Sequence, residues 1–298
     1  MIVDKLIRRI NALKAPIVVG LDPRLDQIPV YLLEENRMKG DTPSKSTARA
    51  ILAFNKKIID AIHDIVPAVK PQIAMYEEWG TNGVTAYHST VSYAREKGLI
   101  VIGDVKRGDI ASTAESYSKA YLSEADNEKR ADFITINPYM GFDSVEPYLS
   151  DCCKYDKGLF VLVKTSNPGS RDLQDLLMLN NKPLYTHVAG LVEKWGEPFI
   201  GEHGYSAVGA VIGATHPKDA LEIRNIMPHT FFLIPGYGVQ GGSGKDLKPL
   251  WRTAYGAIVN NSRGITGAYQ TKKYHAPDAE FHLAARAAVL DMKTDLEI

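Results

Sequence analysis

The stretch LIVIGDVKRGDIAST, residues 99 to 113, joins an uninterrupted apolar run to a dense group of charges. Its first half is rich in β-branched residues and does not alternate between apolar and polar positions, which is typical of a parallel strand covered by helices. Its second half places Asp104, Lys106, Arg107 and Asp109 within six positions. Charges removed from water are costly unless they are paired. The end of this strand is therefore either a solvated turn or a functional site.

Seven other segments have the same apolar character. They are PIVVGLD (16–22), AVKPQIAM (68–75), DFITINPY (132–139), LFVLVKTSN (159–167), AVGAVIGAT (207–215), FFLIPGYG (231–238) and AIVNNSRG (257–264). The segments between them include predicted helices at 46–65 and 113–126, and they are long enough for crossover connections. Eight such units in 298 residues predict an α/β protein of the (β/α)8 TIM barrel class.

The chain shows no internal boundary. No linker rich in Pro, Gly or Ser divides it, so residues 1–298 are expected to form a single domain. The segment 169–206 is longer than one helix requires, and we expect it to carry an insertion.

Composition narrows the classes of partner. Thirty-five basic residues balance thirty-five acidic ones without a basic run, which argues against nucleic acid, and no apolar run is long enough to span a membrane. The first 16 residues have the apolar spacing of an amphipathic helix, and their charges are unlike those of a signal peptide. The adjacent Cys152 and Cys153 are expected to be reduced thiols. These features predict a cytoplasmic protein that binds a small molecule.

Polar side chains occur where the predicted strands end. They are Asp22, Lys70, Asp104, Lys106, Ser166, Asn167 and Arg263. In a TIM barrel the active site lies at this face, and strand alternation should point residues 104 and 106 the same way. A single pair of this kind could equally be a structural ion pair. Because several strands end in polar residues at the same face, a functional site is favoured over a structural ion pair. The eight histidines lack paired metal-ligand spacing, so no metal is expected.

At this level of detail the chain resembles the orotidine 5'-phosphate decarboxylase family. DVKRGDIAST (104–113) is similar to the Asp-x-Lys-x-x-Asp-Ile-x-x-Thr signature of that family. Five further blocks follow the family's order: GLDPR (20–24), AVKPQIAMYE (68–77), VLVKTSNPGS (161–170), PGYGVQGG (235–242) and NNSRGIT (260–266). The KTSNP wording and the long insertion resemble its longer bacterial subgroup.

The resemblance implies a decarboxylase without a cofactor that makes uridine 5'-phosphate (UMP) in the last step of pyrimidine synthesis. Lys106 would protonate C6 of the pyrimidine, and Asp104 would face the substrate carboxylate. Lys70 and Asp109 would complete an alternating array of charges. Preorganised charge of this kind can be the largest contribution to a rate enhancement.

The resemblance also implies substrate contacts and a shared site. Asp22 would bind the ribose hydroxyls, and Ser166 the amide edge of the pyrimidine. The 5'-phosphate would be held by Gln240 and Arg263, under a glycine-rich loop that starts at Pro235. A guanidinium suits this role because it offers two parallel donors to phosphate oxygens. In the implied homodimer, the residues that reach into the neighbouring site are Asp109, Ile110 and Thr113.

Two other functions are compatible with parts of the pattern. One is a magnesium-dependent sugar-phosphate enzyme of the same suprafamily, such as hexulose-phosphate synthase or ketogulonate-phosphate decarboxylase. Those enzymes resemble one another in carrying a metal-binding Glu where this chain has Lys70, whose ammonium would repel the ion. The other is a non-catalytic nucleotide-binding paralogue, which would not require the full set of charges.

Overall fold

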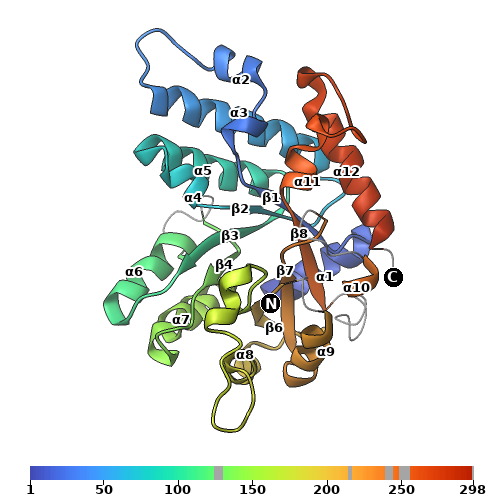
Figure 1. Cartoon of the computed structure of the whole chain (residues 1–298). Coiled ribbons are helices and arrows are strands. Elements are labelled where there is room, and N and C mark those ends of the chain that lie inside the picture. Colours follow the sequence, from blue (N-terminus) through green and yellow to red (C-terminus); the bar gives the residue numbers. More distant parts are fainter. Residues whose placement is uncertain (124–129, 214–216, 239–243, 248–255, 297–298) are drawn as a thin grey trace.

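The computed structural model describes residues 1–123, 130–213, 217–238, 244–247 and 256–296. Within them, parallel strands close into a barrel in chain order, each paired with its neighbours in the sequence and the eighth with the first (Figure 1). The strands are β1 Ile17–Leu21, β2 Ala68–Pro71, β3 Ile100–Arg107, β4 Phe133–Ile136, β5 Gly158–Lys164, β6 Ser206–Ile212, β7 Thr230–Ile234 and β8 Ala257–Asn261. The predicted TIM barrel is confirmed.

Helices surround the barrel on its outside and at its two ends. They are α1 Ile2–Leu13, α2 Val30–Glu35, α3 Pro43–Ile62, α4 Ala74–Glu77, α5 Gly80–Glu96, α6 Ala111–Leu122, α7 Glu146–Tyr155, α8 Leu184–Gly196, α9 Pro217–Ile226, α10 Gly244–Leu247, α11 Arg263–Thr266 and α12 Phe281–Asp295. None of the helices within the described ranges is both long enough and apolar enough to cross a membrane.

Several predicted strands extend too far at their carboxyl ends. The strand predicted at 68–75 stops at Pro71, and α4 begins at Ala74. The strand predicted at 257–264 stops at Asn261, and α11 begins at Arg263. Past the end of the strand, each of these segments turns directly into a short helix at the barrel mouth. The sequence therefore does not mark where the strand stops.

The barrel interior is packed with aromatic rings. Phe133 and Phe160 have ring centroids 5.2 Å apart, and Phe231 lies 6.5 Å from Phe160. Gly158 makes room for them, because a Cβ at this position would lie 2.3 Å from the Phe133 ring. The apolar face of α1 packs against the same cluster and closes the amino-terminal end of the barrel, with Ile2, Leu6 and Ile10 buried. The interior is thus a solid core, and the open end is the one where the strands finish.

The segment 169–206 contains the expected insertion. Between β5 and α8 the chain forms a short 3₁₀ turn, Pro168–Asp172, and then an excursion closed by an antiparallel bridge between Leu177 and Pro183. This excursion lies beside the mouth of the barrel, next to the end of β5.

Candidate active site

Two adjoining cavities open at the carboxyl ends of the strands. They have volumes of about 280 and 380 Å³, and both are lined by Lys70, Asp104 and Pro235. Together they are of the size that small-molecule sites usually have. The first cavity extends toward β1 and β8, and the second toward β5 and β6. The charged residues therefore lie where the two cavities meet.

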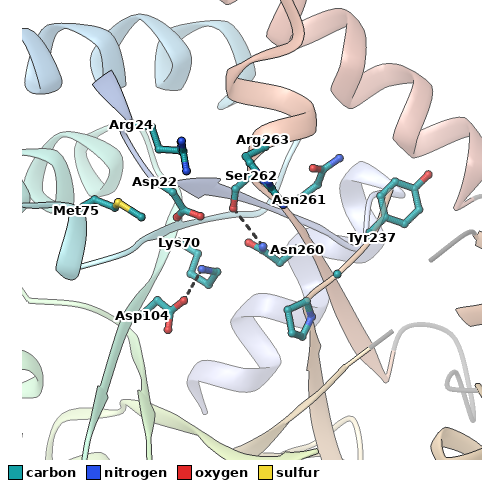
Figure 2. A pocket seen from close by; sticks show the side chains of 12 residues that line it. Asp22, Arg24, Lys70, Met75, Asp104, Tyr237, Asn260, Asn261, Ser262 and Arg263 are labelled. Atoms are coloured by element: carbon teal, nitrogen blue, oxygen red, sulfur yellow. Dashed lines mark hydrogen bonds and ion pairs between the residues drawn. The ribbon is translucent and has the colours of Figure 1, made fainter. Parts of the chain in front are cut away.

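Asp104 lies between two lysines. Lys70 Nζ donates to Asp104 Oδ2 at 2.6 Å, and Lys106 Nζ donates to Asp104 Oδ1 at 2.5 Å. Lys70 and Asp104 are buried, whereas the Lys106 side chain is 47% exposed at the cavity. Figure 2 shows Lys70 between Asp22 and Asp104, with Arg24 and Arg263 on the far side of Asp22. The arrangement exposes one ammonium to a ligand and holds the other in the wall.

The backbone at Lys106 departs from a regular strand. Its φ is 45°, in the left-handed region, and the pairing of β3 with β4 shifts register between Gly103 and Arg107. A residue with a side chain pays about 1 kcal/mol or more for this conformation, and such strain occurs at functional sites. Asp104 and Lys106 do lie side by side as predicted. An irregularity in the strand, rather than simple alternation, brings them together.

Thr135 of β4 holds this irregular segment, and the sequence pattern did not reveal it. Its buried hydroxyl accepts a hydrogen bond from the backbone N–H of Lys106 at 2.9 Å and donates one to Asp104 Oδ1 at 3.0 Å. One hydroxyl thus connects the carboxylate to the backbone of the neighbouring lysine. Nothing in the local sequence FITI distinguishes this threonine from an ordinary strand residue.

The buried charges stabilise one another. Burial by itself would lower the pKa of Lys70, but the carboxylates of Asp104 and Asp22 outweigh it and leave that pKa raised. Burial by itself would raise the pKa of Asp104, but the charges of Lys70 and Lys106 outweigh it and hold that pKa far below its usual range. Lys70 and Asp104 are therefore ionised at neutral pH.

Asp22 lines the first cavity and has one unsatisfied side-chain oxygen. Its Oδ1 is buried and has no hydrogen-bond partner among the described residues. A buried carboxylate oxygen without a donor is costly, so it marks a place where a ligand donor would be stabilising. The hydroxyl groups of a ribose are donors of this kind.

The first cavity also has a cationic end. Arg263 begins α11, is exposed, and makes no ion pair with another residue of the described ranges. Beside it, Gly236 and Gly238 have φ angles of 96° and 72°, which favour glycine. Gln240, the other predicted phosphate ligand, lies outside the described residues.

Sequence reasoning missed other residues of this cavity. They are Arg24, Met75, Tyr237, Asn260, Asn261 and Ser262. All of them lie within or next to the sequence blocks that resemble the family. Their position in those blocks was the one indication that could have identified them.

The second cavity combines an apolar wall with amides and hydroxyls. Leu162, Val211 and Leu233 form the wall. The polar part consists of Ser166, Thr165, Asn167 and the unpredicted Gln174. A flat heterocycle with an amide edge matches such a surface.

Asp109, Ile110 and Thr113 do not line either cavity of their own chain. Asp109 Oδ1 accepts a hydrogen bond from the Ile110 backbone at 2.8 Å, and the Ile110 side chain is on the surface with 49% exposed. The structure thus places these three predicted residues beside the mouth rather than inside it.

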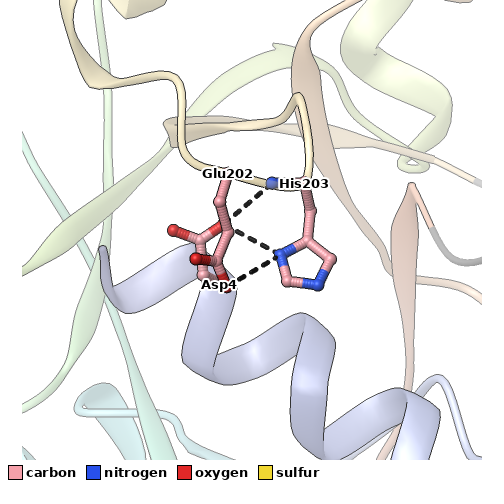
Figure 3. A group of neighbouring side chains, drawn as sticks. All are labelled: Asp4, Glu202 and His203. Carbon is pink, nitrogen blue, oxygen red and sulfur yellow. Dashed lines mark hydrogen bonds and ion pairs between the residues drawn. The ribbon is translucent and has the colours of Figure 1, made fainter.

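One cluster of potential metal ligands occurs among the described residues, beside α1 and away from the barrel mouth (Figure 3). It consists of Asp4, Glu202 and His203. The buried Asp4 accepts hydrogen bonds from the backbone N–H of His203 at 3.2 Å and from the Met1 ammonium at 3.0 Å, and Glu202 pairs with Arg8. These groups already satisfy one another, so the cluster serves to fasten α1 to the barrel.

A closed parallel barrel with an ion-paired Lys–Asp–Lys group at its mouth, between a cationic cavity and an amide-lined one, defines a TIM-barrel enzyme whose site suits a phosphorylated heterocycle. The model of the "Orotidine 5'-phosphate decarboxylase / HUMPS family" matches residues 16–276, and the chain belongs to this family.

Curated relatives are similar over their whole length. The orotidine 5'-phosphate decarboxylase of Petrotoga mobilis is 44% identical over 298 residues, covering 100% of this chain and 98% of the relative. That of Clostridium novyi is 44% identical over 296 residues, covering 99% and 98%.

Solved structures agree with the fold. The putative orotidine 5'-phosphate decarboxylase of Streptomyces avermitilis has a TM-score of 0.78 at 27% identity and covers 99% of this chain and 95% of its own. The OMP decarboxylase of Leishmania donovani has a TM-score of 0.73 at 30% identity and covers 99% and 98%. The resemblance found in the sequence is confirmed.

Proposed function

We propose that the charged group at the barrel mouth carries out the decarboxylation of orotidine 5'-phosphate to UMP, the activity that the names of the curated relatives state. The observation that carries the proposal is the ion-paired series Lys70–Asp104–Lys106, with the exposed ammonium of Lys106 facing the cavity. Residues 1–298 act in it as one catalytic domain.

The reaction requires charge more than covalent chemistry. The bond between C6 and the carboxylate carbon breaks, CO2 leaves, and the electron pair stays on a vinylic carbon that the ring delocalises poorly. The Lys106 ammonium stabilises this pair and then donates a proton to C6, so that UMP is the product. A preorganised ammonium stabilises the transition state without reorganising at the moment of reaction.

Asp104 has two tasks in this scheme. It pairs with both lysines and so keeps the ammonium of Lys106 in place. It also faces the substrate carboxylate, which it repels until CO2 has left. Lys70, buried beside Asp104, offsets the cost of keeping a carboxylate there.

The two cavities divide the substrate between them. Asp22, with its unpaired buried oxygen, takes the ribose hydroxyls, and Ser166 takes the amide edge of the pyrimidine. Arg263 and Gln240 take the 5'-phosphate, beneath the loop that starts at Pro235. Binding energy from the distant phosphate can then hold the pyrimidine against the charged group.

The proposal includes a homodimer in the cytoplasm. Asp109, Ile110 and Thr113 complete the site of the neighbouring subunit, which is supported by their position outside their own cavities and by the exposed Ile110. The cysteines are free, as in a reducing compartment.

A magnesium-dependent sugar-phosphate enzyme is the second candidate, since the family name includes that branch. Lys70 argues against it. Its buried ammonium, paired with Asp104 at 2.6 Å, occupies the position where a divalent cation would need a carboxylate.

A spectrophotometric assay tests the proposal directly. Purified protein is mixed with orotidine 5'-phosphate in a metal-free buffer, and the loss of substrate absorbance is followed. We expect rapid conversion to UMP. Tight binding without conversion would identify a non-catalytic paralogue instead.

A further inference from the structure

The insertion between β5 and α8 contacts the loop that carries Ser166. Gln174 in the insertion uses both ends of its side-chain amide on one residue: its Oε1 accepts from the backbone N–H of Thr165 at 2.9 Å, and its Nε2 donates to Thr165 Oγ1 at 2.9 Å. We refer to this pair of hydrogen bonds as the Gln174 bracket. Thr165 Oγ1 in turn donates a hydrogen bond to Asn167 Oδ1 at 2.7 Å.

The bracket is itself held firmly. The Gln174 backbone donates to Ser170 at 2.8 Å and accepts from Tyr185, the second residue of α8, at 3.0 Å. The next residue, Asp175, pairs with Lys164, whose ammonium lies 4.7 Å from the centre of the Tyr185 ring. Lys164 is buried at the end of β5, so this contact fixes the insertion to the barrel.

Ser166 is confined from its other side by β6. Gly213 follows β6, and a Cβ there would lie 2.9 Å from the backbone of Ser166. The backbone of Ser166 therefore lies between Thr165, which Gln174 holds, and the backbone of Gly213 at the end of β6. A serine whose backbone is held in this way has its Cβ position set before a ligand arrives, so less ordering is needed when the ligand binds.

We propose that Gln174 is a positioning residue for the pyrimidine, and that the insertion thereby forms part of the subsite that recognises the base. The inference rests on the proposed function, because it takes Ser166 as the residue that faces the amide edge. In this proposal Gln174 acts through Thr165, to which both ends of its side-chain amide are hydrogen-bonded.

Two probes separate the base subsite from the rest of the site: UMP, and ribose 5-phosphate, which lacks the pyrimidine. Gln174→Met removes both hydrogen bonds and keeps the length of the side chain. We expect it to weaken UMP binding roughly tenfold, as the loss of two bonds between neutral groups suggests, and to change ribose 5-phosphate binding less than about twofold. Leu179→Ala, in the same insertion but fully exposed, is the matched control and should bind both like the wild type.

A double variant tests whether the effect passes through Ser166. Ser166→Ala alone should also weaken UMP selectively, and adding Gln174→Met to it should cause little further loss. If Gln174→Met does not fold, Thr165→Val, which removes one of the two bonds, should show a smaller selective loss of UMP affinity.

The outcomes are distinct. Equal weakening of UMP and ribose 5-phosphate would mean general loosening and would overturn the inference, as would wild-type affinity for UMP in Gln174→Met while the wild-type enzyme turns over substrate. Absence of turnover in the wild type would overturn the proposed function, and the inference with it.

Discussion

Lys70 Nζ lies 2.6 Å from Asp104 Oδ2, and both side chains are buried at the mouth of the barrel. Removing one member of such a pair leaves an uncompensated charge in a poorly solvated place, which commonly costs about 3–5 kcal/mol. The pair therefore connects the stability of the barrel to the charge arrangement of the site.

Stability should depend on pH through this pair. The pKa of Asp104 is lowered in the folded protein, so its contribution is complete above its unfolded value, about 4, and is lost as the pH falls below it. The pKa of Lys70 is raised, so its contribution is complete below about pH 10 and is lost as the pH rises further. Urea unfolding from pH 2 to 11 should show a plateau between these limits. In Asp104→Asn the acid decline should be shallower, and an unchanged acid slope would contradict the pairing.

Lys106 and Arg263 should separate chemistry from binding. Lys106→Ala removes the proton donor but leaves the cationic cavity, so turnover should be lost while UMP still binds. Arg263→Ala removes charge-assisted hydrogen bonds and should weaken UMP by about 1.5–3 kcal/mol per bond lost. Steady-state kinetics and calorimetric titration with UMP measure the two effects. Near-normal turnover by Lys106→Ala would exclude the mechanism proposed above.

Thr135 should affect the chemical step rather than the binding of the substrate's phosphate. Thr135→Val keeps the shape of the side chain but removes the hydroxyl that connects Lys106 N to Asp104 Oδ1. Because one bond goes to a charged group, we expect kcat to fall by roughly 10- to 100-fold with little change in KM. Thr135→Ser retains the hydroxyl and should recover most of the activity. If valine and serine variants behave alike, the hydroxyl has no positioning role.

Activity should survive exhaustive chelation. The charge at the reacting carbon is supplied by a lysine in this scheme, so dialysis against EDTA should leave kcat/KM unchanged within error. Loss of activity that magnesium restores would instead favour the sugar-phosphate branch of the family.

Mixed dimers should reveal a shared site. Lys106→Ala and Asp109→Ala chains, each inactive alone, are refolded together. If Asp109 serves the neighbouring subunit, each heterodimer has one site with both residues intact, and random pairing should restore roughly a quarter of wild-type activity. If Asp109 serves its own chain, every site carries one lesion, and a mixture shown to contain heterodimers stays as inactive as its parents.

Much of the fold was accessible from local sequence. Strands buried on both faces form continuous β-branched runs, and each of the eight runs of this kind overlaps one strand of the barrel. The face that carries the candidate site could also be predicted, because the carboxyl ends of parallel strands all lie at one end of the barrel. Asp22, Lys70, Asp104 and Arg263 could be placed together there from their positions in the chain alone. The strand ends were less accessible, because an apolar residue continues as readily into a short helix as into a strand.

Tertiary structure decided the contacts between side chains distant in the sequence. Thr135 holds Asp104 from 31 residues away, and Gln174 holds Thr165 across a turn of the insertion. The left-handed backbone of Lys106 depends on the register of a neighbouring strand. A residue's own neighbours in the sequence reveal its burial and its periodicity, since these follow from the geometry of one element. They do not reveal which partner will satisfy its hydrogen bonds, because that partner is chosen only when separate elements pack together.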